Sequence, residues 1–111
     1  CRRVAEKLTR YPFPKQRPAF LRNAITNSNL ELDCYCDKLK IAIEYNGRQH
    51  YEYTPYFHSS RDAFYTIKYR DEMKARLCRE NNVTLIVVPY TVPVNRIESY
   101  IQNEFFTLGL L

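Results

Sequence analysis

Two short segments with apolar residues at alternate positions constrain the fold of this 111-residue chain more than any other feature. In residues 30–33 two leucines alternate with two acids, and in residues 39–44 leucine and isoleucines alternate with Lys40, Ala42 and Glu44. A period of two is typical of a β-strand. The sequence therefore predicts two strands, with residues 36–38 forming the turn between them.

The predicted hairpin brings Asp33 and Glu44 together. Residues opposite each other in an antiparallel pair share one face, with Cβ atoms about 5 Å apart. Two carboxylates that close repel, and a hard cation such as Mg²⁺ removes the repulsion while keeping positions for water and substrate phosphates. The pair is a candidate metal site for phosphodiester hydrolysis. The alternative is that both acids simply belong to the solvated face of a half-buried hairpin.

A dense run of polar side chains follows the second predicted strand. It supplies amide, guanidinium, imidazole and phenol groups within seven residues: Tyr45, Asn46, Gly47, Arg48, Gln49, His50 and Tyr51. Polar groups at this density seldom serve packing alone. The run favours a functional site at the end of this strand.

The rest of the chain predicts an α/β sandwich. Val4 and Leu8 lie one helical turn apart, so residues 1–10 are expected to form a helix, and three prolines predict a loop over residues 11–19. Residues 49–58 form either a third short strand or an ordered loop, and Pro55 argues against a central strand there. Histidine 58, in this polar loop, is expected to be solvated, with substrate contact as the alternative.

The second half of the chain contributes two helices and a strand. Ser60 is a predicted N-cap for a helix over residues 60–81, and a continuous apolar run at 83–89 predicts a strand in the middle of the sheet, buried on both faces. A last helix is expected from Pro93 to just before Gly109. This order implies a three-layer α-β-α sandwich with a mixed β-sheet.

One acid on the helix over residues 60–81 requires an explanation. Asp71 falls in the middle of an apolar stripe, and a lone buried charge is costly, so it must be paired, capped or functional. Lys68 and Lys74 lie three residues either side of it. Either they pair with Asp71, or one of them points into the acidic face of the hairpin. The stripe consists of Phe64, Ile67, Ala75 and Cys78.

Composition narrows the class of protein. The net charge of +5 favours a polyanionic partner, and ten Tyr and six Phe provide rings able to stack on bases. The four cysteines have neither zinc-site spacing nor disulfide-scaffold density, so free thiols are expected. No apolar run is long enough to span a bilayer. A soluble, intracellular domain, in cytoplasm or nucleus, is expected.

Several motifs in succession resemble the PD-(D/E)XK, or restriction-endonuclease-like, nucleases. They are "LELDCY", "IAIEYNGRQHY", "IKYRDEMKARLC" and "VTLIVVPY". With "CRRVAEKL" and "FPKQRPAFLRN" ahead of them, the chain looks closest to the very-short-patch-repair-like branch found in large DNA viruses and phage-like elements. The likeness covers nearly the whole chain. It implies a restriction-endonuclease-like fold and a viral, Mg²⁺- or Mn²⁺-dependent endonuclease acting on nucleic acid, most of all DNA.

The resemblance also assigns the metal ligands. Asp33 matches the first metal-binding acid and Glu44 the second, with the main-chain carbonyl of Tyr45 as a third ligand. Where many relatives have lysine, this chain has Asn46, and a neutral amide cannot supply the charge that stabilises a transition state. His50, which resembles the active-site histidine of the repair branch, and Lys74 or Lys68 are the candidate replacements.

The remaining roles follow from the same resemblance. His50 would assist proton transfer, and Gln49 and Asn46 would orient the attacking water. Phosphate contacts are expected from Arg48, Lys68 and Lys74.

A first-helix acid completes the pattern in relatives, where a glutamate stands just ahead of a cysteine like Cys1. The chain begins without Met and is expected to be a domain excised from a longer protein, so that glutamate would lie before residue 1. Glu6 is a poor substitute by spacing. Two alternatives therefore remain open. One is a weakened or inactive nuclease fold that binds nucleic acid or serves as a scaffold, and the other is a basic protein-interaction module.

Overall fold

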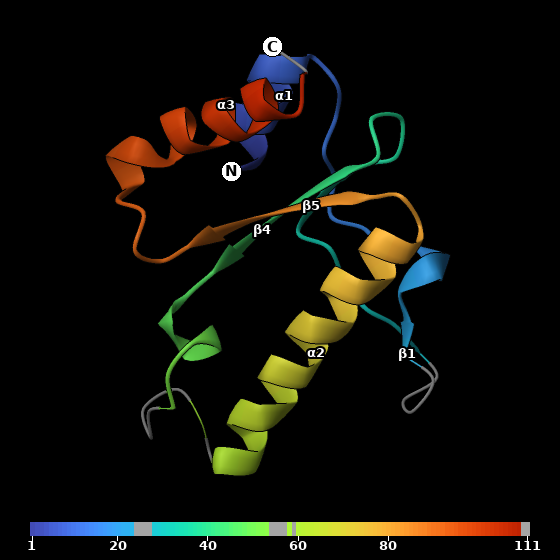
Figure 1. Cartoon of the computed structure of the whole chain (residues 1–111), viewed down its shortest axis with the longest axis vertical. Helices are drawn as coiled ribbons and strands as arrows, with labels where there is room; N and C mark the ends of the chain where they lie inside the picture. Colours follow the sequence, from blue (N-terminus) through green and yellow to red (C-terminus); the bar gives the residue numbers. More distant parts are fainter. Residues whose placement is uncertain (24–27, 54–57, 59, 110–111) are drawn as a thin grey trace.

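The computed structural model describes residues 1–23, 28–53, 58 and 60–109, and folds them into helices on both sides of a central sheet (Figure 1). The three α-helices are α1 (Arg2–Thr9), α2 (Arg61–Glu80) and α3 (Ile97–Thr107). The strands are β1 (Arg22–Asn23), β2 (Ser28–Asn29), β3 (Cys34–Cys36), β4 (Ile41–Asn46) and β5 (Thr84–Pro89). Single 3-10 turns occur at η1 (Ala19–Leu21), η2 (Arg48–His50) and η3 (Val94–Arg96).

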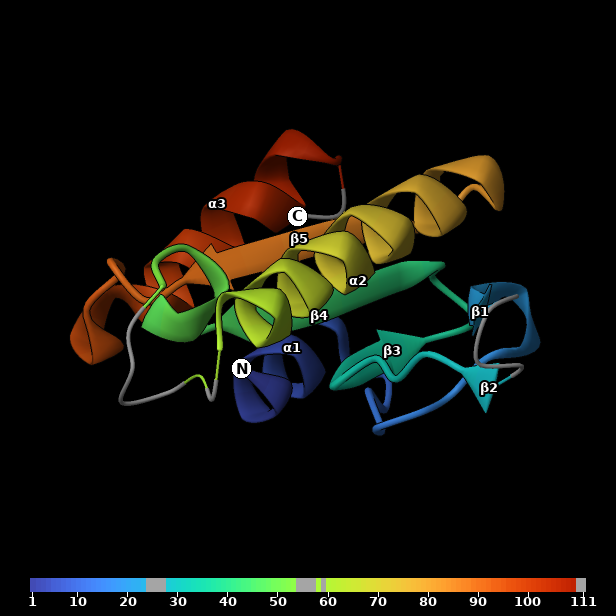
Figure 2. The ribbon, with the colours of Figure 1, turned by 90° about the horizontal axis from the view of Figure 1, so that it is seen from below.

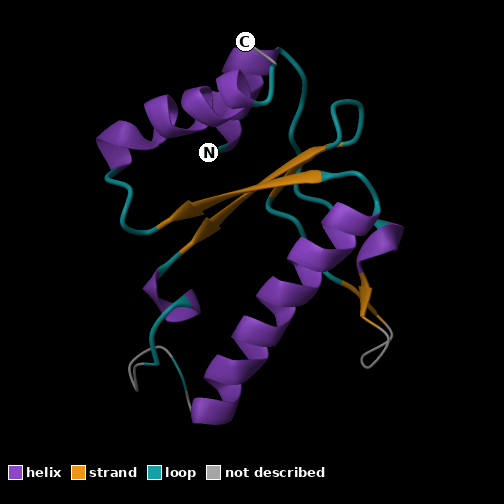
Figure 3. Cartoon of the chain, viewed as in Figure 1, coloured by secondary structure: helices purple, strands orange, loops and turns teal. Residues whose placement is uncertain are grey.

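The central sheet has the order β3-β4-β5 and is mixed. β3 pairs antiparallel with β4, and β4 pairs parallel with β5, which the chain reaches after passing through α2. Figure 3 shows β4 and β5 side by side, with α2 on one side and α3 on the other. Helix α1 lies next to α3, so the sheet is enclosed between α2 and the α1/α3 pair (Figure 2). The expected α/β architecture with a mixed sheet is confirmed.

Two apolar cores fill the space on the two faces of the sheet. On the α1/α3 face, Cys34, Ile43 and Val88 pack against helix residues such as Phe105. The alternate strand residues point the other way and meet α2. That second core contains Leu21, Leu32, Tyr35, Ala42, Cys78 and Val83. Both faces are therefore apolar, which explains why each strand residue of β3 is buried.

The hairpin forms as predicted, but its first strand is shorter and begins later. The chain bends at Asp33, and β3 starts at the next residue, while Leu32 forms an isolated bridge with Gln16. Cys36 belongs to the strand instead of the turn, which occupies residues 37–40 and has Lys40 at φ 56°. The bend has a packing cause. Leu32 enters the α2-side core, whereas Cys34 enters the core on the other face.

The prediction that the apolar run at 83–89 lies mid-sheet is wrong. Among the described strands, β5 is at one edge of the sheet and β4 is central. The run is apolar because α2 and α3 cover the two faces of β5. A strand enclosed by helices on both faces reads the same in sequence whether it is central or at an edge.

The helices agree closely with their predicted bounds. Ser60 caps α2, since its Oγ accepts a hydrogen bond from the backbone N–H of Ala63 at 3.2 Å. One stripe residue is misplaced: Ala75 is exposed, and the helix instead buries Met73 beside Cys78. In the described part of residues 49–58, η2 extends to His50 and no strand forms; Pro55 lies outside the described residues. None of the described helices has the length and apolarity needed to cross a membrane.

Candidate functional site

Asp33 and Glu44 come together on the face of the sheet that α2 covers. The β3–β4 pairing begins with Cys34 and Ile43, and the carboxyl of Asp33, at the bend just before this strand, lies close enough to Glu44 to raise its pKa. Glu44 is nearly enclosed, with 5% of its surface exposed. The acid pair predicted from the alternating pattern is therefore a feature of the fold, at the point where β3 begins.

The environment of Glu44 favours its protonated form. Burial, and then the neighbouring Asp33 carboxyl, raise the pKa of Glu44 from 4.5 to about 7, although Lys74 opposes the shift. A carboxyl with this pKa is only partly ionised near neutral pH. More positive charge than the lysine supplies would be needed to hold both acids ionised.

Lys74 is the cation that reaches this pair. Its Nζ donates a hydrogen bond of 2.7 Å to Glu44 Oε1, and only about a fifth of its side chain is exposed. The alternative in which one lysine of α2 points into the acidic face of the hairpin is thus the correct one. Thirty residues separate the two groups in sequence, and α2 closes that distance.

Asp71 is paired with His50, and not with Lys68 or Lys74 as one prediction had it. The imidazole Nδ1 lies 2.9 Å from Asp71 Oδ2 and 3.1 Å from Oδ1, with about a quarter of each side chain exposed. An ionised carboxylate only accepts hydrogen bonds, so Nδ1 carries the proton and Nε2 of the neutral ring is left as an acceptor. Asp71 and Lys74 are neighbours on one face of α2.

Four other predicted residues lie near the end of β4 but engage other partners. Arg48 forms an ion pair with Glu52 at 2.7 Å, and the Lys68 ammonium lies 5.7 Å from the centre of the Tyr51 ring. Asn46 hydrogen-bonds the same phenol. Gln49 folds over Gly47, where an added Cβ would lie 2.5 Å from Gln49 Oε1. In the described part of the chain, no hydrogen bond or ion pair joins these four to Asp33 or Glu44.

Histidine 58 is buried, so the expectation that it is solvated is wrong. It is 3% exposed, its Nε2 lies 2.9 Å from the carbonyl oxygen of Gln49, and its ring stacks on Tyr53 and meets Phe64 edge-on. This histidine supports the turn that carries His50. The aromatic residues on both sides of it in sequence were the signal that it belongs to a small core.

Glu6 has a structural partner away from the acid pair. Its Oε2 accepts a hydrogen bond of 2.8 Å from the backbone N–H of Phe13, which fixes the chain after α1. The spacing argument against Glu6 as a metal ligand agrees with this contact. All four cysteines are free thiols, as expected.

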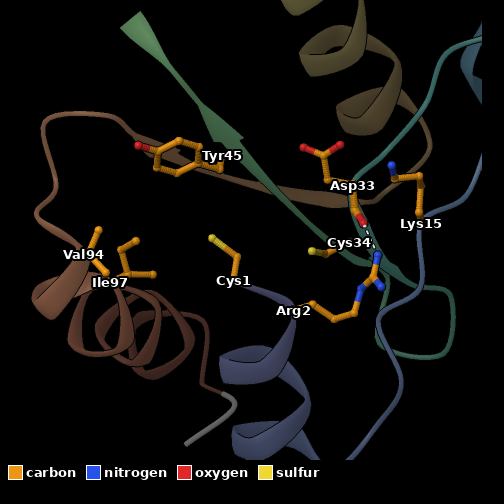
Figure 4. Close-up of a pocket in the computed structure, with 8 residues that line it drawn as sticks. All are labelled: Cys1, Arg2, Lys15, Asp33, Cys34, Tyr45, Val94 and Ile97. Carbon is orange, nitrogen blue, oxygen red and sulfur yellow. Dashed lines mark hydrogen bonds between the residues drawn. The ribbon is translucent and has the colours of Figure 1, made fainter.

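A cavity of about 440 Å³ opens beside Asp33 (Figure 4). Arg2 donates to the main-chain oxygen of Asp33 at 3.2 Å, and the Asp33 carboxylate points to the opposite side of its backbone, with Lys15 nearby. The exposed ring of Tyr45 forms part of the wall. Sequence reasoning missed Arg2 and Lys15, because nothing in the local pattern links them to a residue more than fifteen positions away.

The donors available for a metal ion are few and all oxygen. Within the described ranges, no group of three or more His, Cys, Asp and Glu side chains is placed to hold an ion. Asp33 and Glu44 bring two carboxyl groups together here, and the resemblance adds the backbone carbonyl of Tyr45. A set of two carboxylates and a carbonyl suits Mg²⁺, which keeps several waters and substrate oxygens in its shell.

Three viral proteins are similar to this chain. It is 47% identical over 111 residues to uncharacterized protein 033L of Invertebrate iridescent virus 3, covering all of this chain and 57% of that protein. It is 52% identical over 105 residues to uncharacterized protein 307L of Invertebrate iridescent virus 6, covering 90% of this chain and 52% of the relative. Uncharacterized protein 094L of Frog virus 3 is 44% identical over 104 residues, with 93% and 66% covered.

The chain thus spans between about half and two thirds of the length of these curated relatives. No family model matches the chain. No solved structure matches it either.

Proposed function

We propose that the chain is a nuclease domain with a restriction-endonuclease-like fold, which hydrolyses phosphodiester bonds of nucleic acid, with DNA as the expected substrate. The observation that carries the proposal is that Asp33 and Lys74 both lie beside the buried carboxyl of Glu44 on β4. The motif resemblance supports it. We extend the proposed nuclease activity to the longer protein that would contain this domain.

Mg²⁺ or Mn²⁺ fits this set of residues. The Asp33 and Glu44 carboxylates and the Tyr45 carbonyl would hold the ion, and the raised pKa of Glu44 reflects a need for more positive charge at the pair. When bound, such an ion polarises the scissile phosphate and lowers the pKa of a bound water.

Lys74 takes the role that Asn46 cannot fill. Its ammonium is held against Glu44 by the packing of α2 and would lie beside the phosphate oxygens on which negative charge develops. A preorganised cation in a largely enclosed position stabilises such charge more than one in water does. The helix therefore provides what relatives place two residues along the strand.

His50 is the proposed proton acceptor. Asp71 holds the ring through Nδ1, which leaves Nε2 to accept a proton from the attacking water. Asp71 is then a positioning residue that fixes the ring and its tautomer. Gln49 and Asn46 stay predictions for orienting that water, as do Arg48 and Lys68 for phosphate contacts.

The test is plasmid nicking with matched acid variants. The chain, and a full-length protein containing it, would be incubated with supercoiled DNA and Mg²⁺ or Mn²⁺. Asp33→Ala and Glu44→Ala should abolish nicking, whereas Asp37→Ala, an exposed acid on the same hairpin, should not. Cleavage that survives either of the first two changes would reject the assignment.

One contact favours a second candidate, a nuclease fold that binds nucleic acid without cleaving it. The Lys74–Glu44 ion pair partly neutralises the buried acid, as a site that had lost its metal would require. Calorimetric titration with Mn²⁺ separates the two candidates. Heat of binding that disappears in Glu44→Ala supports the nuclease, and the absence of binding supports the non-catalytic domain.

A further inference from the structure

A second cavity lies on the other side of Lys74, between α2 and the small hairpin of β1 and β2. Its volume is about 260 Å³. Three stretches of chain form its walls: the proline-rich loop, strands β1 and β2 with the residues after them, and α2. The charged lining residues are Arg17, Glu31, Arg70 and Lys74, and the neutral polar ones are Asn23, Ser28 and Asn29.

Lys74 connects this cavity to the acid pair. The side chain lines the cavity, and its Nζ also donates to Glu44. One lysine therefore separates the cavity from the carboxylates proposed to hold a metal ion. A strand of nucleic acid with one phosphodiester at the acid pair would have a neighbouring phosphate within reach of this cavity.

Arg17 is fixed in the cavity wall. Its Nη1 donates to the backbone oxygen of Asn29 at 3.2 Å, and Nη2 lies 3.4 Å from Glu31 Oε2. Asn29 donates back from Nδ2 to the Arg17 carbonyl oxygen at 3.3 Å. A guanidinium has five N–H donors, so these contacts hold the group in place and leave donors for a ligand.

Arg70 contributes the uncompensated charge. Its side chain is exposed and forms no ion pair or hydrogen bond with any residue that the structure describes. It lies one helical turn before Lys74, and like charges four residues apart on a helix repel. Glu31 and Glu44 offset Arg17 and Lys74. An anion in the cavity would offset Arg70 and relieve the repulsion along the helix.

We propose that this cavity binds a backbone phosphate of the nucleic-acid strand, next to the phosphodiester at Asp33 and Glu44. The inference rests on the proposed function, because it takes that pair as the point of cleavage. Planar guanidinium groups match phosphate oxygens in a two-pronged geometry. The volume is below the roughly 300–1,000 Å³ of pockets for drug-sized ligands, which suits a phosphate with part of its sugar.

The test compares two exposed arginines on α2. Arg70→Gln removes the cavity charge, and Arg79→Gln removes an arginine further along the helix that does not line the cavity. Binding of labelled single-stranded and duplex oligonucleotides would be measured by fluorescence anisotropy in EDTA, so that no cleavage occurs. Arg70→Gln should weaken binding about tenfold at low salt, as expected for a charge-assisted contact. Arg79→Gln should leave affinity unchanged.

Salt dependence identifies the contact as one with phosphate. Loss of one phosphate contact should lower the slope of log affinity against log salt by about 0.9 for duplex or about 0.7 for single strands. Arg17→Gln should act in the same direction. Equal affinities and slopes for the Arg70 and Arg79 variants would overturn the proposal. Binding of inorganic phosphate would be measured by ³¹P NMR. An Arg70→Gln variant that no longer binds inorganic phosphate but binds oligonucleotides as before would also overturn the proposal.

Plasmid nicking separates this proposal from the one on which it rests. If the unaltered chain nicks DNA with neither Mg²⁺ nor Mn²⁺, and Arg70→Gln still binds oligonucleotides more weakly than the unaltered chain, the phosphate site is supported and the nuclease is rejected. Nicking that requires Asp33 and Glu44, with oligonucleotide binding unchanged in Arg70→Gln, rejects the phosphate site alone. Absence of oligonucleotide binding by the unaltered chain overturns the phosphate site.

Discussion

The ammonium of Lys74 lies 2.7 Å from a carboxylate oxygen of Glu44, so a helix and a strand that are distant in sequence meet in one charged contact. Among the described residues, Lys74 is the only ion-pair partner of this nearly enclosed acid. The contact couples the charge state of the acid pair to the position of α2.

Replacing Lys74 with Met should abolish most nicking while the protein stays folded. Removing one preorganised group that stabilises a transition state typically costs a factor of about 10² to 10³ in turnover. Lys7→Met is the control, since its exposed ammonium pairs with Glu98 and has no part in the proposed site. The first-order rate of plasmid nicking at saturating Mg²⁺ measures both. Similar losses in the two variants would contradict a specific role for Lys74.

Stability should fall as pH rises through the range where Glu44 ionises. The pKa of Glu44 is raised from 4.5 to about 7 in the folded chain, so its stabilising effect is fully present below about pH 4.5 and is lost as pH rises through 7. The shift corresponds to roughly 3 kcal/mol. Glu44→Gln should remove this decrease. Urea unfolding of both proteins at pH 5 and pH 8 gives the comparison, and an identical pH dependence would disprove the shift.

Substitution of His50 should affect the nicking rate, whereas substitution of His58 should affect stability. His50→Ala is expected to lower the nicking rate with little loss of stability, because its ring is part-exposed beside Asp71. His58→Ala should lower the free energy of unfolding by about 1–3 kcal/mol, since it removes a buried ring and its hydrogen bond. Thermal melts and nicking assays on both variants test this. Added imidazole should restore part of the nicking rate of His50→Ala but not that of His58→Ala.

Cys78 should resist thiol reagents until the protein unfolds. Burial raises the pKa of the Cys78 thiol from 9.0 to about 11, and only the thiolate reacts. The group's contribution to stability is fully present below pH 9 and is lost as pH rises from 9 through 11. Labelling with a disulfide reagent at pH 8, with and without urea, and mass mapping checks the prediction. Reaction of Cys78 in the native protein as fast as in urea would contradict it.

The local elements of the fold follow from the sequence to a large extent. The hairpin, the Ser60 cap and the helix over residues 60–81 depend on neighbouring residues, so alternation and capping signals predict them. The start of β3 and the edge position of β5 cannot be predicted from such local signals. Both depend on which helix covers which face, and the local pattern does not contain that information.

In the candidate site too, some residues could be predicted from the local sequence and others are positioned only by tertiary packing. Alternation in the two strand segments predicted that Asp33 and Glu44 lie together, and they do, although Asp33 lies at the bend before β3. Lys74, Arg17 and Arg70 reach their places only through the packing of α2 and the β1–β2 hairpin. Sequence alone offered Lys68 and Lys74 as equal candidates. The direction of the helix face selects Lys74.

Helix α2 carries Arg70, Asp71 and Lys74 as one rigid unit, anchored near its end by Cys78 in the α2-side core. An α-helix advances about 1.5 Å per residue, so a shift of one residue at that anchor would carry Asp71 and Lys74 away from His50 and Glu44 and would move Arg70 along the cavity. The apolar contacts around Cys78 therefore determine where the charged face of α2 lies. A substitution in this apolar core should impair the proposed reaction as much as a substitution of one of the carboxylates.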